Sequence, residues 1–136
     1  MNKDTAILYV EDDPGSRKVM RMVLRNVLGI VNLNIFENSE NFYARVEAIT
    51  PKPDLILLDI HLEPYDGFTM LKILRESADF GTTRVVALTA SVMNEEIQQL
   101  KSVGFDGVIA KPVNVDTLPG LLQRIMDGES IWTVMK

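Results

Sequence analysis

The sequence predicts an α/β fold in which a doubly wound, five-stranded parallel sheet is flanked by five helices. Five short apolar runs alternate along the chain with longer stretches of helical periodicity. Such alternation is typical of strand–helix–strand units with right-handed crossovers. Three of the runs are apolar throughout, as parallel strands covered on both faces are. We expect the strands to lie in the order 2-1-3-4-5.

The apolar runs are the predicted strands. The second run differs from the others because Val31, Leu33 and Ile35 alternate with Asn32 and Asn34. One face of that strand should meet water, so we expect it at an edge of the sheet. In chain order the five runs are Ala6–Val10, Val31–Phe36, Leu55–Leu58, Val85–Leu88 and Val108–Ala110.

The stretches between the strands predict the helices. Two of them carry the i, i+3, i+4, i+7, i+8 apolar stripe of a helix that faces a core. The first stripe consists of Met20, Val23, Leu24, Val27 and Leu28. The second consists of Leu118, Leu121, Leu122, Ile125 and Met126. Shorter helical patterns fall in residues 39–49, 67–77 and 93–103.

Local signals indicate where some helices begin. Asp13 followed by Pro14 combines a capping carboxylate with a proline suited to the first helical position. Ser39 and Glu40 after Asn38 form a weaker start for the second helix. Pro119 lies too deep in a last helix capped by Asn114, because an internal proline removes a hydrogen bond and clashes with the preceding turn. That helix should begin nearer Asp116 or have a distorted first turn.

Length and charge limit the classes of protein. The chain has 136 residues, enough for one domain, and no cysteine, which excludes disulfides and thiolate metal sites. Its net charge of −5 disfavours direct binding to nucleic acid. The first residues lack the pattern of a signal peptide, and no apolar run is long enough to span a bilayer. We expect a cytoplasmic protein that is not inserted in a membrane.

Polar residues follow four of the strands at the point where each strand ends. Because the carboxyl ends of parallel strands share one edge of a sheet, and ligands bind beyond that edge, these residues should gather there. They are Glu11, Asp12 and Asp13 after the first strand, Asp59 after the third, Thr89-Ala90-Ser91 after the fourth and Lys111-Pro112 after the fifth.

This combination of residues favours phosphoryl chemistry supported by Mg²⁺. Crowded carboxylates repel one another unless a cation lies among them, and Mg²⁺ suits a site with few carboxylates, several waters and a phosphate oxygen. Lys111 and Thr89 offer a positive charge and a hydroxyl donor to a phosphoryl group. A carboxylate can carry that group as an acyl phosphate, and Asp59, alone at the end of the central strand, is the best nucleophile. Taken singly, each of these residues could also be a helix cap, a solvated loop charge or an ordinary strand end.

Four segments together resemble the receiver domains of response regulators, the stand-alone chemotaxis type and its relatives, from about Thr5 to Asp127. The resemblance implies a flavodoxin-like fold, with a receiver domain over residues 1–129 and a tail over 130–136. The segments are Leu8-Tyr9-Val10-Glu11-Asp12-Asp13, Pro53-Asp54-Leu55-Ile56-Leu57-Leu58-Asp59 with Asp66-Gly67, Ala87-Leu88-Thr89-Ala90 and Ile109-Ala110-Lys111-Pro112.

The resemblance assigns a role to each residue of the site. Asp59 is implied as the phosphoacceptor and a metal ligand, and Glu11 and Asp12 as the acidic pair that holds Mg²⁺. The backbone carbonyl of His61 is implied as a further ligand. Thr89 and Lys111 are implied to contact phosphoryl oxygens. In the family, side chains at the places of His61 and Ser91 lean over the phosphoryl group and tune its hydrolysis.

The chain departs from the family in two further places. Glu63 stands where a proline is usual, and Pro64 follows it, so the loop after Asp59 carries a shifted turn. Val108 stands where the family often has an aromatic residue whose rotamer reports phosphorylation. We therefore expect the switch to act by backbone movement around residues 89–91. Trp132, in the tail, is expected to be loosely ordered or to dock on a partner.

Several functions share parts of this pattern of residues. The main hypothesis is a phosphoacceptor switch, not an enzyme in the ordinary sense: a sensor histidine kinase or phosphotransfer protein phosphorylates Asp59 in a two-component phosphorelay, and binding of a downstream protein changes. An aspartyl phosphatase typically has a second Asp two residues after the nucleophile, where this chain has His61. A scaffold that is never phosphorylated would have lost a residue of the set, and none is lost. A flavodoxin-like cofactor binder needs a phosphate-binding loop after the first strand, which is missing.

Overall fold

The computed structural model describes residues 4–132 and contains the predicted sheet. All five strands are parallel, in the order β2-β1-β3-β4-β5, which confirms the predicted topology. The strands are β1 Ala6–Val10, β2 Asn32–Phe36, β3 Leu55–Asp59, β4 Arg84–Thr89 and β5 Val108–Ala110. The helices are α1 Pro14–Arg21, η1 Met22–Val27, α2 Phe42–Glu47, α3 Gly67–Arg75, α4 Asn94–Val103 and α5 Leu118–Met126.

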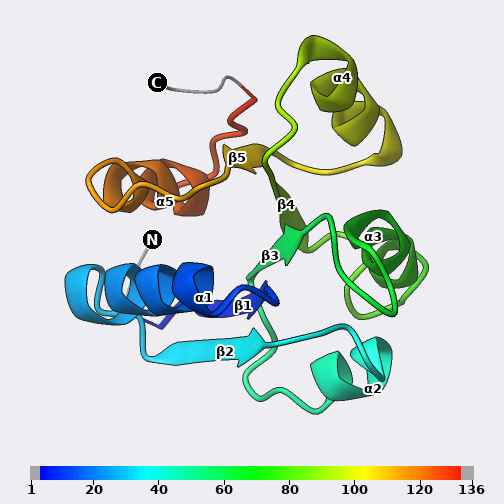
Figure 1. Cartoon of the computed structure of the whole chain (residues 1–136). Helices are drawn as coiled ribbons and strands as arrows, with labels where there is room; N and C mark the ends of the chain where they lie inside the picture. Colours follow the sequence, from blue (N-terminus) through cyan, green and yellow to red (C-terminus); the bar gives the residue numbers. More distant parts are fainter. Residues whose placement is uncertain (1–3, 133–136) are drawn as a thin grey trace.

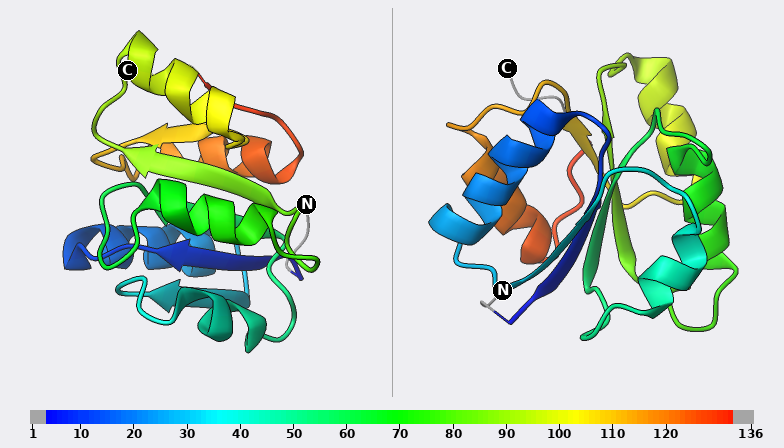
Figure 2. Two further views of the ribbon diagram at one scale, coloured as in Figure 1. Left: turned by 90° about the vertical axis from the view of Figure 1, so that its right-hand side faces the viewer. Right: turned by 60° about the horizontal axis from the view of Figure 1, so that its bottom comes forward.

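The helices form one layer on each face of the sheet. Figures 1 and 2 show α1 and α5 on one face and α2, α3 and α4 on the other. Each layer encloses its own apolar core, because neighbouring residues of β1 and β3 point to opposite faces. Leu8 and Ile56 face the α2–α3–α4 layer, whereas Ile7 and Leu57 face the α1–α5 layer. The central strands are therefore apolar throughout, as the sequence predicted.

The edge position predicted for the second strand is confirmed. β2 pairs only with β1 and ends the sheet on that side. Leu33 is buried and Asn34 is exposed, as the alternation requires. Val31 precedes the strand and is 63% exposed, so its predicted place in the strand was wrong.

The first helical stripe is correct in part. Met20 in α1 and Val23 and Leu24 in η1 are fully buried, but Val27 is 57% exposed. The backbone explains the difference: from Met22 the helix widens into a π-helical turn, and the Leu28 N–H donates to the Val23 carbonyl, five residues back. A stripe spaced for 3.6 residues per turn loses its register there, and Val27 turns towards water.

The second helix starts later than predicted. Its N-cap is Asn41 and its first residue is Phe42, so Ser39 is not the cap. Ser39 is fully buried instead, and its hydroxyl donates to the Tyr65 carbonyl and accepts from the Tyr65 N–H, both at 2.7 Å. These bonds join the loop before α2 to the loop after β3, a connection that sequence patterns do not reveal.

The chain after β5 agrees with the expected late start of the last helix. A turn precedes α5, which begins at Leu118, so Pro119 lies in the first helical turn, where its missing N–H costs nothing. The predicted stripe on this helix is buried or packed against the core. Trp132 was expected to be loosely ordered, and this was wrong, because it is half-buried against the α2–α3–α4 core. The tail residues 133–136 lie outside the described part of the chain.

Candidate phosphorylation site

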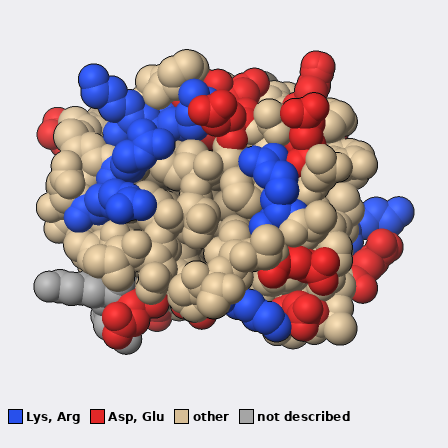
Figure 3. Space-filling model, turned by 90° about the horizontal axis from the view of Figure 1, so that it is seen from below, with Lys and Arg blue, Asp and Glu red and all other residues tan. Residues whose placement is uncertain are grey.

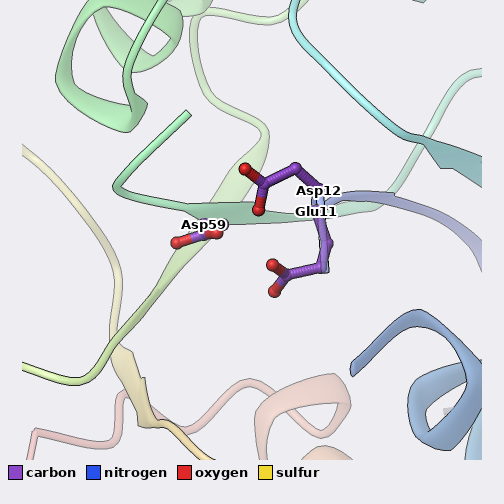
Figure 4. A group of neighbouring side chains, drawn as sticks. All are labelled: Glu11, Asp12 and Asp59. Atoms are coloured by element: carbon purple, nitrogen blue, oxygen red, sulfur yellow. The ribbon is translucent and has the colours of Figure 1, made fainter. Parts of the chain in front are cut away.

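Three carboxylates meet at the carboxyl edge of the sheet. Glu11 and Asp12 follow β1, and Asp59 ends the neighbouring strand β3. One oxygen from each of the three carboxylates lies within 4.8 Å of the others. Figure 4 shows the three side chains converging from the ends of the two strands. Glu11 and Asp59 are buried, whereas Asp12 is exposed, so the cluster opens to solvent on the side of Asp12.

Lys111 brings a positive charge into this cluster from the far edge of the sheet. Its ammonium group donates to Glu11 Oε2 at 3.0 Å and to Asp59 Oδ2 at 3.3 Å. The Lys111 N–H donates to the Thr89 carbonyl at 2.9 Å, which extends the pairing of β4 and β5 by one residue. The ammonium group is thereby held between two carboxylates that would otherwise repel each other.

The environment of Glu11 opposes the ionisation of its carboxyl group. Burial, followed by the nearby Asp59 carboxyl group, raises the pKa of Glu11, although hydrogen bonds from Tyr9 and Lys111 act in the opposite direction. Burial by itself would lower the pKa of Lys111, but its bonds to Glu11 and the charge of Asp59 outweigh this and hold the pKa above its usual value. Lys111 therefore stays cationic, and the site has more negative charge than its one cation can balance.

Asp13 has a structural role at the start of α1. Its carboxylate accepts from the Ser16 N–H and the Ser16 hydroxyl, both at 2.8 Å. These bonds lower the pKa of Asp13. Its own N–H donates to Glu11 Oε2 at 3.2 Å. The predicted helix cap is confirmed, and it fixes the turn that presents Glu11 and Asp12.

Thr89 and His61 border the site on the α4 side. Thr89 is buried, and its hydroxyl oxygen accepts from the Ser91 N–H at 3.0 Å. The His61 side chain is exposed, and its backbone N–H donates to Asp59 Oδ1 at 3.2 Å. A hollow of about 140 Å³ lies between them, lined by Ile60, His61, Phe68, Thr89, Ser91, Glu96, Gln99 and Leu100. The site thus continues into a mostly apolar hollow that reaches α4.

The loop between Asp59 and α3 is shaped by close backbone packing. The Gly67 N–H donates to the Ile60 carbonyl at 2.9 Å. A Cβ atom on Gly67 would lie 2.9 Å from Ile60 Cα and 2.7 Å from Ile60 Cδ1, so only glycine fits without movement. Asp66 caps α3 by accepting from the Thr69 N–H at 2.8 Å. The shifted turn at Glu63 and Pro64 lies within this loop, which Ser39 holds through Tyr65.

Two contributors to the site were missed by sequence reasoning. Tyr9 is fully buried and donates its hydroxyl proton to Glu11 Oε1 at 2.8 Å. Burial, and then Glu11, raise the pKa of Tyr9, so the phenol stays protonated and remains a donor. The sequence did contain a signal for Tyr9, since residues two apart on a strand share a face.

Glu96 was missed as well: its Oε2 is shielded from solvent and has no hydrogen-bond partner in the described residues. Nothing in the helical pattern of residues 93–103 marked it.

The donor set fits a hard divalent cation. All three clustered side chains offer carboxylate oxygens, and one of them is exposed and so accessible to a hydrated ion. The three carboxylates share a single ammonium group, that of Lys111, so a cation among them would reduce their mutual repulsion. Glu11, Asp12 and Asp59 are thus the residues that could hold Mg²⁺.

The fold and this site define a family. Residues 7–123 match the response regulator receiver domain, so the chain belongs to that family and is a receiver domain of two-component phosphorelay signalling. Receiver domains are phosphoacceptor switches rather than ordinary enzymes and are phosphorylated by histidine kinases. Among curated proteins, the chain is 28% identical over 126 residues to the signal transduction histidine-protein kinase BarA of Escherichia coli. That alignment covers 92% of this chain but only 13% of the kinase.

Solved structures agree with the fold. The chemotaxis response regulator CheY4 of Vibrio cholerae is similar with a TM-score of 0.79 and 24% identity, covering 90% of this chain and 98% of CheY4. The receiver domain of the sensor histidine kinase PA1611 of Pseudomonas aeruginosa is similar with a TM-score of 0.76 and 25% identity, covering 92% and 99%. That structure holds a magnesium ion coordinated in its active site cleft. Within residues 4–132, none of the helices has the length and apolar character needed to cross a bilayer.

Proposed function

We propose that Asp59 is the phosphoacceptor of this receiver domain and that Glu11, Asp12 and Asp59 hold the Mg²⁺ that phosphorylation requires. The observation that carries the proposal is the convergence of one cation and two other carboxylates on Asp59. Asp59 Oδ2 lies 3.3 Å from the Lys111 ammonium, and the two other carboxylates lie within 4.8 Å. No other part of the described chain combines these groups.

The proposed reaction moves one phosphoryl group. A carboxylate oxygen of Asp59 attacks phosphorus on a phosphohistidine; the new O–P bond forms as the N–P bond breaks, and the histidine nitrogen leaves with its electron pair. Negative charge on the phosphoryl oxygens must be balanced for a carboxylate to attack. Lys111, already beside Asp59, is placed to contact one oxygen, and bound Mg²⁺ would supply further positive charge. We expect the backbone carbonyl of His61 to complete the metal site.

Thr89 is proposed to contact a further phosphoryl oxygen. Its hydroxyl oxygen accepts a hydrogen bond from the Ser91 N–H. If the Thr89 hydroxyl moves to donate to a phosphoryl oxygen, the loop that begins at Ser91 and leads into α4 should move with it. This links the state of Asp59 to residues 89–91 and to α4. The surface formed by α4, β5 and α5 is then the one that would change its affinity for a downstream protein.

The donor is proposed to be a sensor histidine kinase or a phosphotransfer protein, acting in the cytoplasm. Figure 3 shows a band of basic side chains on one side of the face viewed from below, next to acidic ones. In α1 and η1 the exposed cations are Lys18, Arg21 and Arg25, which follow the acidic cluster directly in the chain. An acidic surface on the donor would be attracted to these cations in a protein whose net charge is −5. The domain is proposed to span residues 1–129, with 130–136 as its tail.

Labelling with acetyl phosphate followed by mass spectrometry tests the proposal. One phosphoryl group should be added in the presence of Mg²⁺ and none in EDTA. Asp59→Asn should abolish labelling and leave the fold intact, because it removes one of several crowded anions. Asp54→Asn, which changes a carboxylate at the opposite end of β3, is the matched control and should be labelled like the unchanged protein. Equal labelling in EDTA, or of Asp59→Asn, would show that the site is wrong.

Two further variants separate the role of the metal ion from that of the Lys111 ammonium group. Asp12→Ala removes the exposed carboxylate, so it should weaken Mg²⁺ binding and slow labelling, and more Mg²⁺ should partly restore the rate. Lys111→Ala removes the ammonium group on Asp59, so it should impair transfer or its structural effect at every Mg²⁺ concentration. Recovery of the Lys111 variant by added Mg²⁺ alone would contradict this division.

A further inference from the structure

The segment after α5 is bound to the outer edge of the sheet. The Val108 N–H of β5 donates to the Ile131 carbonyl at 2.8 Å. Arg84, at the start of β4, donates to the carbonyls of Gly128 and Glu129. Figure 1 shows this segment in red, leaving α5 and passing β5 towards α4. It therefore covers the β5 edge, where the last strand would otherwise present an unpaired N–H.

Side chains anchor this segment in both apolar layers. Ile131 is 6% exposed and packs in the α1–α5 core. Trp132 packs against the α2–α3–α4 core, and the Lys101 ammonium of α4 lies 5.3 Å from the centre of its ring. A buried aliphatic side chain and a half-buried aromatic one, with a cation over the ring, form a specific docking arrangement. We call residues 130–132 the C-terminal strap.

The domain provides a fitted place for this strap. Gly107 lies under it, and a Cβ atom there would come within 3.2 Å of the Ile131 oxygen and 3.3 Å of the Ile131 nitrogen. The next residue, Val108, stands where the family often has an aromatic residue. Valine is small enough to be buried in its strand, at 2% exposed. The absence of a side chain at 107 allows the strap to lie close to β5.

The strap and the hollow at the border of the phosphorylation site share one apolar core. Thr89 and Leu100 both line the hollow that His61 also borders. Leu100 and Val108 belong to the core against which Trp132 packs, and Lys101 follows Leu100 in α4. A shift of α4 driven by Thr89 would therefore change the contacts of Trp132.

We propose that the strap is a phosphorylation-sensitive cover: it occupies the β5–α4 surface in the resting protein, and phosphorylation of Asp59 releases it for a partner to bind there. The inference rests on the proposed role of Asp59. Because such coupling is reciprocal, a change that releases the strap should also stabilise the phosphorylated state, and by the same free energy by which phosphorylation promotes release. Couplings of this kind commonly change an equilibrium by about 5- to 150-fold.

The single tryptophan of the chain allows a direct test, because all tryptophan fluorescence comes from Trp132. Acrylamide quenching and the emission maximum are measured on the full chain with Mg²⁺, before and after acetyl phosphate, and the same samples are analysed by mass spectrometry. We expect a resting tryptophan that is partly shielded from acrylamide, and a several-fold larger quenching constant with a red-shifted emission after labelling. Asp59→Asn should show neither change.

Strap variants test the reciprocal effect with beryllofluoride, a non-covalent mimic of the phosphoryl group. Ile131→Ser removes the apolar anchor, and Lys101→Ala removes the cation over the ring while leaving the core intact. Both should bind beryllofluoride several-fold more tightly in calorimetry with Mg²⁺. Val31→Ser, on the opposite edge of the sheet and 63% exposed, is the control and should not change the affinity.

The outcomes separate the two proposals. Labelling of Asp59 without a change in Trp132 quenching would contradict the proposal that the strap is a cover, but would support Asp59 as the phosphoacceptor. A tryptophan already open to acrylamide in the resting chain, or unchanged beryllofluoride affinity in both strap variants, also overturns the cover. Failure to label Asp59 at all overturns the phosphoacceptor and the cover together.

Discussion

At the scale of single residues, Glu11 is subject to opposing electrostatic influences. It is fully buried, bonded to the Tyr9 hydroxyl on one oxygen and to Lys111 on the other, with the Asp59 carboxylate close by. One ammonium group serves both carboxylates, so the metal-free site carries uncompensated negative charge. A buried charge in this position costs stability, whereas the protonated form does not.

The raised pKa of Glu11 predicts an unusual dependence of stability on pH. A carboxyl group whose pKa is higher in the folded state binds more protons when folded, so stability falls as pH rises from the unfolded value, 4.5, through the raised folded value. Denaturation in EDTA should show this fall in the unchanged protein and a smaller one in Glu11→Gln. The variant should gain stability relative to the unchanged protein as pH rises across that window.

Asp13 serves as the control, because its pKa is shifted in the opposite direction. Its hydrogen bonds from Ser16 lower the pKa, so its contribution is present above the unfolded pKa and is lost as pH falls through the lowered folded value. Asp13→Asn should therefore remove stability gained on raising the pH. A stability difference between Glu11→Gln and the unchanged protein that is constant with pH would contradict the assignment.

At the scale of elements, the β3–α3 connection is predicted to tolerate only glycine at position 67. The close approach to Ile60 should make Gly67→Ala destabilising by about 1–3 kcal/mol, since backbone atoms must move. Gly120 lies in α5 with nothing within 4 Å of its Cβ position. Gly120→Ala should therefore stabilise the protein by up to about 1 kcal/mol through lower backbone entropy in the unfolded chain. Urea denaturation of both variants checks the pair, and an equal effect of the same sign would refute it.

The π-helical turn after α1 predicts which apolar residues matter. Leu24→Ala should cost about 2–5 kcal/mol, because Leu24 is fully buried. Val27→Ala should change stability by no more than about 0.5 kcal/mol, because Val27 faces water although it belongs to the sequence stripe. Similar losses in thermal or urea denaturation would show that the helix keeps ordinary α-helical register in solution.

At the scale of the whole molecule, the two helical layers differ in their connection to the phosphorylation site. The site lies at the sheet edge where both layers meet, and Lys111 and Glu11 that form it are separated by 100 positions in the chain. The hollow beside Thr89 is lined by residues of α3 and α4, which belong to one of the two layers. A change at Asp59 should therefore reach α4, β5 and α5 before it reaches β2 and α2.

This path predicts where amide resonances should move on phosphorylation. The largest shifts outside the site should fall at residues 89–91, in α4 and along β5, because Val108 provides no aromatic rotamer to report the state. Two-dimensional amide spectra with and without beryllofluoride in Mg²⁺ measure this. Shifts confined to β2 and α2 would contradict the proposed switch surface.

Local patterns in the sequence were sufficient to predict the order and type of the elements. Uniform apolar runs predicted buried parallel strands, and the half-polar run predicted the edge strand, because burial of one or both faces selects residue types directly. Asp59 and Lys111 could be placed at one edge since parallel strands end together. These inferences depend on the periodicity of each segment and on the parallel strand direction that the alternation of strands and helices implies.

Tertiary structure alone decided the rest. The exposure of Val27 depends on a π-helical turn, the burial of Ser39 on a loop 26 positions away, and the docking of Trp132 on the fitted edge of β5. The raised pKa of Glu11 likewise arises from burial and from groups on other strands. The Ser39, Trp132 and Glu11 features are contacts between segments distant in the chain, and their free energy exists only once the fold has brought these segments together. The π-helical turn at Val27 is local, but it departs from the 3.6-residue period on which the predicted stripe was based.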